Sequence, residues 1–157
     1  MTNLKPVLED QSFFEGLDDK YLELLAGCAK NIAFEAGEFV FHVGDEANHL
    51  FIVRSGRIAV EIDPPGRGPI TIQTLGNGDI LGWSWMVPPH QYFYDAQAIK
   101  KTQVISLDAN CLREKCEEGH SLGYELFKRL IPVIGQRMHS ARMQLLDMYG
   151  VPSKGQF

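Results

Sequence analysis

Residues 50–60 have the sequence LFIVRSGRIAV, and this stretch decides the fold class. Two apolar runs, 50–53 and 58–62, are rich in Ile, Val and Phe, which favour extended strands. Ser55-Gly56 separates the runs and is a turn signal, because glycine adopts positive φ without a Cβ clash. The stretch therefore predicts two short strands joined by a tight turn.

The same pattern continues in both directions along the chain. Further strands are predicted at 32–34, 39–43, 70–75 and 103–107, and glycine or proline turns separate them at 36–38, 44–45, 64–66, 76–79 and 88–89. Turns this close together leave no room for crossover helices. We therefore predict a mainly β fold, a double-stranded β-helix or jelly-roll-like β-roll, over residues 30–108.

Helical periodicity flanks the predicted roll. In the N-terminal helical part, 10–29, apolar residues from Leu17 to Cys28 recur every three or four positions. After the roll, Asp108 is a candidate N-cap for helices across 109–149. Residues 1–150 are thus expected to form a single domain, followed by a flexible tail at 151–157.

The long C-terminal helix is predicted at 121–149, about 40 Å at 1.5 Å per residue. This is longer than a roll of this size needs for cover, and Pro132 is expected to bend the helix. One stripe follows near-heptad spacing: Phe127, Leu130, Ile134, Met138, Ala141, Leu145 and Met148. We predict a homodimer through this stripe; packing of the same stripe against its own roll is the alternative.

Composition limits the possible functions. The chain has 157 residues, 45% of them hydrophobic, and a formal net charge of −5, which argues against general affinity for nucleic-acid backbones. The first ten residues have no apolar run of signal-peptide length, and no run elsewhere approaches a membrane span. We expect a cytoplasmic protein without a membrane segment.

Cysteine and histidine spacing gives no metal or catalytic motif. Cys28, Cys111 and Cys116 are odd in number, and we expect reduced structural thiols. The five histidines lack metal-ligand spacing, and no nucleophile motif is visible. We therefore predict no cofactor and no enzymatic activity.

Four segments carry a family resemblance: FEAGE at 34–38, GD at 44–45, the opening stretch at 50–60, and GDILG at 78–82. With these residues the chain resembles the cyclic-nucleotide-binding domain family, the effector domain of catabolite-activator-type regulators and of cyclic-nucleotide-regulated kinases and channels. The resemblance covers roughly residues 10–150 and implies a β-roll sensor that binds a small-molecule effector.

The resemblance also identifies the stretch GWSWMVPPHQYFYDA, residues 82–96, as the phosphate-binding cassette. Family members hold the ribose with a glutamate after the glycine and the cyclic phosphate with an arginine nine or ten residues later. Here Trp83 replaces the glutamate, Tyr92 or Phe93 replaces the arginine, and no arginine occurs between Arg67 and Arg113. Loss of the charged contact predicts roughly tenfold to hundredfold weaker binding of cyclic AMP or cyclic GMP.

We therefore expect an effector other than these two nucleotides. The candidate effector-binding residues are Leu81, Gly82, Trp83, Ser84, Trp85, Tyr92, Phe93, Tyr94 and Arg142. The aromatic rings offer stacking area, and Arg142 on the long helix is a candidate for the missing cation. Two alternatives stay open: a ligand-free protein-interaction module whose rings fill the pocket, and a cyclic-nucleotide binder that uses Arg142 and backbone amides.

Relatives that regulate transcription continue past the long helix into a helix-turn-helix domain. This chain ends at Phe157, eight residues after the predicted helix, so we expect no direct DNA binding. A haem ligated by His90 or an iron–sulphur cluster is likewise not expected, since one loop histidine and three dispersed cysteines do not make such a site.

Overall fold

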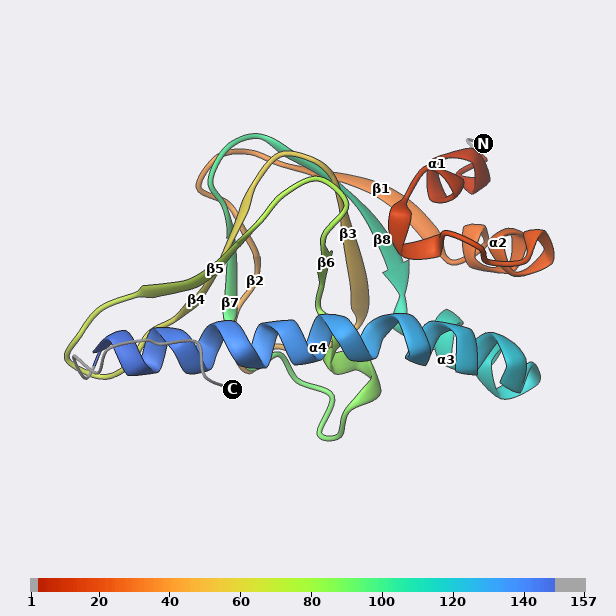
Figure 1. The fold of residues 1–157 in the computed structure, drawn as a ribbon. Coiled ribbons are helices and arrows are strands. Elements are labelled where there is room, and N and C mark those ends of the chain that lie inside the picture. The colour runs from red at the N-terminus through yellow and green to blue at the C-terminus, as the bar shows by residue number, and fades with distance from the viewer. Residues whose placement is uncertain (1–2, 149–157) are drawn as a thin grey trace.

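The computed structural model describes residues 3–148, and its strands form two four-stranded antiparallel sheets. One sheet has the strand order β1 (Ala29–Phe34), β8 (Thr102–Asp108), β3 (His49–Ser55) and β6 (Ile80–Leu81). The other has the order β2 (Phe39–Phe41), β7 (Asp95–Ala98), β4 (Ile58–Ile62) and β5 (Ile70–Leu75). Figure 1 shows the two sheets side by side above a long helix. The predicted β-roll is confirmed.

The opening stretch of the sequence lies at the centre of this arrangement. β3 pairs with β8 in a register that sets Ile52 opposite Ile105, and both side chains are fully buried. Gly56, between β3 and β4, has φ of +126°, and a Cβ there would lie 2.6 Å from the Cα of Thr102. Only glycine fits this turn, because a side chain would meet both an unfavourable φ and the backbone of β8.

Two strands and one helix escaped sequence-based prediction. β6 has only two residues, and β7, with the sequence DAQA, contains no large apolar side chain. α1 (Lys5–Glu9) is a five-residue helix before the predicted helical part, with Leu8 buried. Elements this short are fixed by the strands and helices they pack against, not by their own periodicity.

The N-terminal segments pack against one end of the roll. The 3₁₀ turn η1 (Ser12–Phe14) leads to α2 (Asp19–Ala26), whose N-cap Asp18 accepts a hydrogen bond from the Lys20 N–H at 3.4 Å. Leu22 and Leu25 of α2 are buried. The helix predicted around Leu17 to Cys28 is therefore present.

Two helices follow the roll. α3 (Ala109–Glu118) is capped by Asp108, which accepts from the Cys111 N–H at 2.8 Å, and α4 (His120–Met148) runs beneath both sheets (Figure 1). α4 continues as a single helix through Pro132. The predicted tail at 151–157 lies outside the described residues. Across residues 3–148, no helix combines the length and apolar character needed to cross a membrane.

The expectation of reduced thiols is wrong for two of the three cysteines. Cys28 and Cys111 form a disulfide across a sequence separation of 83, whereas Cys116 has a free thiol. The cause is tertiary: β1 pairs with β8 so that Ala29 faces Leu107, which brings the residue before β1 next to the first turn of α3. Neither the composition of the chain nor the spacing of its cysteines predicts this proximity.

Candidate functional site

The cassette segment, residues 82–96, begins with a sharp turn. Gly82 has φ of +84°, and a Cβ there would lie 3.1 Å from the His49 carbonyl oxygen. The turn leads into η2 (Trp83–Met86), a 3₁₀ helix of four residues. η2 is a single turn, so the helix start expected from the family resemblance is too short to act as an anion site by itself.

Tyr92, one of the two residues at the place where the resemblance expected an arginine, lies in the interior. Its side chain is only 3% exposed, and its ring stacks on Phe41 with 3.6 Å between centroids. Its hydroxyl donates to the His49 carbonyl oxygen at 2.8 Å. Burial raises the pKa of Tyr92 well above its ordinary value, so this wall of the site is neutral.

The tryptophan turn is also packed into the fold. Trp85 is 2% exposed and Ser84 is fully buried, while Trp83 is partly buried. The Arg113 Nη1 donates to the Trp85 carbonyl oxygen at 2.6 Å and ties η2 to α3. Three polar atoms here are buried without a hydrogen-bond partner: Trp83 Nε1, Ser84 Oγ and Trp85 Nε1. The turn is thus a core element that retains unused hydrogen-bonding capacity.

An arginine enters the site from α4, and it is Arg137. The side chain is 6% exposed; Nη1 donates to Tyr94 Oη at 3.3 Å and Nη2 to the Ile80 carbonyl oxygen at 2.8 Å. Burial raises the pKa of Tyr94, although Arg137 and the Gly82 backbone oppose this shift. Tyr94 therefore joins the cassette segment to α4 as a neutral phenol.

Sequence-based reasoning missed Arg137 and named Arg142 instead. Arg142 is exposed on α4, because five residues turn a helix by about 140° and place the two side chains on different sides. The sequence did contain a signal for the burial of Arg137. It follows Leu130 by seven residues, which places both on the same side of the helix, and Leu130 is fully buried.

Of the predicted effector residues, the structure brings Leu81, Gly82, Ser84, Trp85, Tyr92 and Tyr94 into the interior. Phe93 points outward and is 51% exposed, since alternate residues of the extended segment point to opposite sides. Within the described part of the chain, no group of three or more His, Cys, Asp or Glu side chains is placed to hold a metal ion.

The exposed stripe of α4 lacks one residue of the predicted dimer seam and includes two residues that the prediction omitted. Leu130 is fully buried and faces the core together with Leu122 and Leu126, so its assignment to the seam is wrong. Phe127, Met138, Ala141 and Leu145 are exposed, and Ile134 and Met148 are half-buried. Tyr124 and Ile131, which the prediction omitted, are exposed on the same face. The resulting α4 stripe is Tyr124, Phe127, Ile131, Ile134, Met138, Ala141, Leu145 and Met148.

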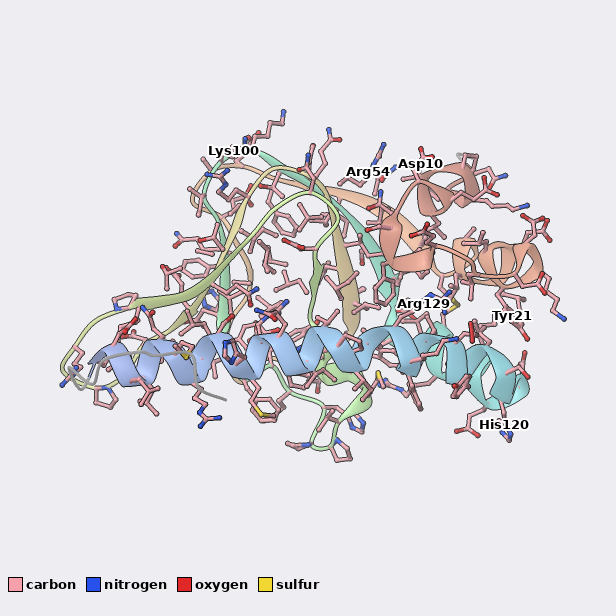
Figure 2. The ribbon with its side chains drawn as sticks, in the orientation of Figure 1. Asp10, Tyr21, Arg54, Lys100, His120 and Arg129 are labelled. Atoms are coloured by element: carbon pink, nitrogen blue, oxygen red, sulfur yellow. A yellow bond between two sulfur atoms is a disulfide. The ribbon has the colours of Figure 1, made fainter. Side chains whose placement is uncertain are left out.

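Arg129 lies on another side of α4, toward η1 and α2 (Figure 2). Its guanidinium donates to the Glu15 carbonyl oxygen at 2.8 Å and pairs with Glu125 at 3.0 Å. These contacts fix the start of α4 against the N-terminal segment.

Comparison with known proteins finds distant relatives of several kinds. A CRP-like cAMP-activated global transcriptional regulator from Mycobacterium tuberculosis is 21% identical over 142 residues, 90% of this chain and 62% of its own length. Cyclic nucleotide-gated ion channel 18 from Arabidopsis thaliana is 27% identical over 111 residues, 64% of this chain and 16% of its own. The chain thus spans less than two thirds of these curated relatives.

Solved structures share the fold. A cyclic nucleotide-binding domain from Methylobacillus flagellatus superposes with a TM-score of 0.77 at 19% identity, covering 93% of this chain and 82% of that one. The regulatory subunit of a cAMP-independent protein kinase A from Trypanosoma brucei gives 0.70 at 18% identity, covering 92% and 50%. The sequence model of the cyclic nucleotide-binding domain matches residues 31–118, more than half of the chain. The protein therefore belongs to the cyclic nucleotide-binding domain family, a family of regulatory sensor domains.

Proposed function

We propose that the protein is a non-enzymatic, cytoplasmic regulatory domain whose effector is neither cyclic AMP nor cyclic GMP. Tyr92 carries the proposal. A phenol stacked on Phe41 and bonded to His49 stands inside the core at one of the two cassette positions where the family resemblance implies a phosphate-binding arginine. A cyclic phosphate there would meet a neutral wall and lose a charged contact of about 1.5–3 kcal/mol.

The Trypanosoma brucei relative supports this proposal. Its kinase is described as cAMP-independent, and its regulatory subunit has the same fold as this chain. The fold is therefore compatible with regulation that does not use cyclic AMP. The residues of this chain determine which effector replaces cyclic AMP.

Calorimetric titration with cyclic AMP and cyclic GMP tests the proposal. We expect no saturable heat at micromolar nucleotide, and micromolar or tighter binding would refute it. If such binding occurs and Arg142→Ala abolishes it, the protein is a cyclic-nucleotide binder that uses the exposed arginine of α4.

A ligand-free interaction module is the second candidate function. The burial of Trp85 at 2% exposure favours it, because a ring packed into the roll removes room for an effector. Under this function, docking of a partner protein replaces effector binding. Failure of a broad metabolite screen to raise the Tm, together with recovery of a stable complex from cells, would support it over the sensor function.

We further propose that α4 pairs with α4 of a second copy through the α4 stripe. Its positions follow alternating steps of three and four, the spacing of a two-stranded coiled coil, and Ile131 and Met138 are 62% and 67% exposed. Large apolar side chains in a continuous row are costly to leave in water. Pairing with the same row on a second copy would remove these side chains from water.

Sedimentation equilibrium tests the dimer. We expect wild-type protein to sediment as a dimer and the double variant Ile131→Glu, Met138→Glu as a folded monomer, because four carboxylates would face one another across the seam. His139→Glu adds one negative charge per chain at an exposed position off the stripe and should stay dimeric. A monomeric wild type, or a dimeric double variant, would contradict the proposal.

A further inference from the structure

The buried guanidinium of Arg137 has no opposite charge beside it. Within residues 3–148, no carboxylate lies within 4.0 Å of it, and its bonded neighbours are the neutral Tyr94 hydroxyl and the Ile80 carbonyl. Its Nε is buried without any hydrogen-bond partner. Burying a charge without a counter-charge is unfavourable, so this part of the fold gains stability when an anion comes within reach.

A cavity of about 310 Å³ lies next to this side chain, between α4, η1 and the turn from β5 to β6. Arg137 and Gln73 both line it. Gln73 Oε1 is the second buried polar atom of this cavity without a partner. Two residues of the walls thus carry an unused cationic donor and an unused acceptor, and Phe13, Leu75 and Val133 add apolar surface.

One carboxylate bears on the choice of ligand. Asp79 also lines the cavity, where it accepts from the Gly76 N–H at 2.8 Å. Its negative charge opposes a ligand that carries two charges more than one that carries a single charge. A monocarboxylate is therefore favoured over a phosphate dianion.

We propose that this cavity binds a small organic monocarboxylate that also carries a hydrogen-bond donor. The carboxylate accepts from Arg137 Nε, a hydroxyl or N–H of the ligand donates to Gln73 Oε1, and the apolar body lies against Phe13, Leu75 and Val133. The inference rests on the proposed sensor function and names its effector class. It also gives a route to regulation, because the ligand would join α4, and so the α4 stripe, to the roll.

Thermal-shift and calorimetric titrations with 4-hydroxybenzoate and 4-hydroxybutyrate test the proposal. Both carboxylates should raise the Tm of the wild-type protein in a dose-dependent way at millimolar concentration. The neutral 4-hydroxybenzamide should give no shift, and inorganic phosphate a smaller one. Arg137→Met should weaken carboxylate binding roughly tenfold to hundredfold, with partial recovery in Arg137→Lys.

A second variant covers the case in which Arg137→Met does not fold. Gln73→Glu places a carboxylate on the wall of the same cavity, so it should raise the Tm without ligand and abolish the response to 4-hydroxybenzoate. Gln103→Glu makes the same change at an exposed position on β8 and should leave both quantities unchanged.

Several results would overturn the proposal. They are the absence of a Tm shift with both carboxylates, an equal shift with the amide, a full response in Gln73→Glu, or loss of the response in Arg142→Met together with its retention in Arg137→Met. Parallel titration with cyclic AMP separates the two proposals. Carboxylate failure alone refutes this inference, whereas cyclic AMP binding refutes the proposed function.

Discussion

The Cys28–Cys111 disulfide should contribute a large part of the free energy of unfolding. It closes a loop across a sequence separation of 83. The loss of loop entropy in the unfolded chain then amounts to about 4.5 kcal/mol at 25 °C. For a chain of 157 residues, each kcal/mol shifts the Tm by roughly 2–4 °C, so removal of the bond should lower the Tm by roughly 9–18 °C.

The measurement is a thermal melt of wild-type protein and of the double variant Cys28→Ala, Cys111→Ala, each with and without a phosphine reductant. Reductant should lower the Tm of the wild type to near that of the double variant and should leave the double variant unchanged. Cys116→Ala removes the free thiol and should keep both the high Tm and its sensitivity to reductant.

Two results would refute this reasoning. One is an equal Tm for the wild type with and without reductant while the protein remains two-state. The other is the titration of three free thiols in protein unfolded without reductant, since the structure allows only one.

Two further predictions concern the core. Gly56→Ala should lower the free energy of unfolding by at least about 2 kcal/mol, because the new Cβ meets the Thr102 backbone at positive φ. Gly37→Ala, at φ of +91° with open space around it, should lower it by only about 1 kcal/mol. Equal urea midpoints for the two variants would contradict this prediction. Burial raises the pKa of Tyr92, so its stabilising contribution is complete below about pH 10, where the unfolded phenol ionises, and is lost as pH rises toward the folded pKa. Urea midpoints should therefore fall more steeply above about pH 10 in wild type than in Tyr92→Phe, and parallel profiles would show that Tyr92 does not cause the decline.

The sequence was sufficient for the β-roll. Strand-favouring residues in runs of a few positions, separated by turns such as Ser55-Gly56, predicted six of the eight strands, because each signal depends on neighbouring residues. It was also sufficient for the altered cassette. The replacement of the expected charged residues by Trp83 and by Tyr92 or Phe93 is visible without coordinates.

The orientation of α4 needed the tertiary structure. Periodicity showed that a face of this helix is apolar, and it assigned Leu130 to the dimer seam and Arg142 to the site. The roll occupies one side of α4, and this contact buries Leu130 and Arg137 while leaving Ile131 and Met138 in solvent. Two apolar stripes on one helix cannot be told apart until a neighbour covers one of them.

Local sequence signals determined the secondary-structure elements. They also showed which charged residues the cassette segment lacks. The contacts between distant segments decided which arginine of α4 is buried beside the cassette segment and which cysteines pair. Arg137 meets Tyr94 across 43 residues, and Cys28 meets Cys111 across 83. Such meetings depend on strand pairing and helix packing over the whole chain, because the sequence specifies each partner but not the distance between them.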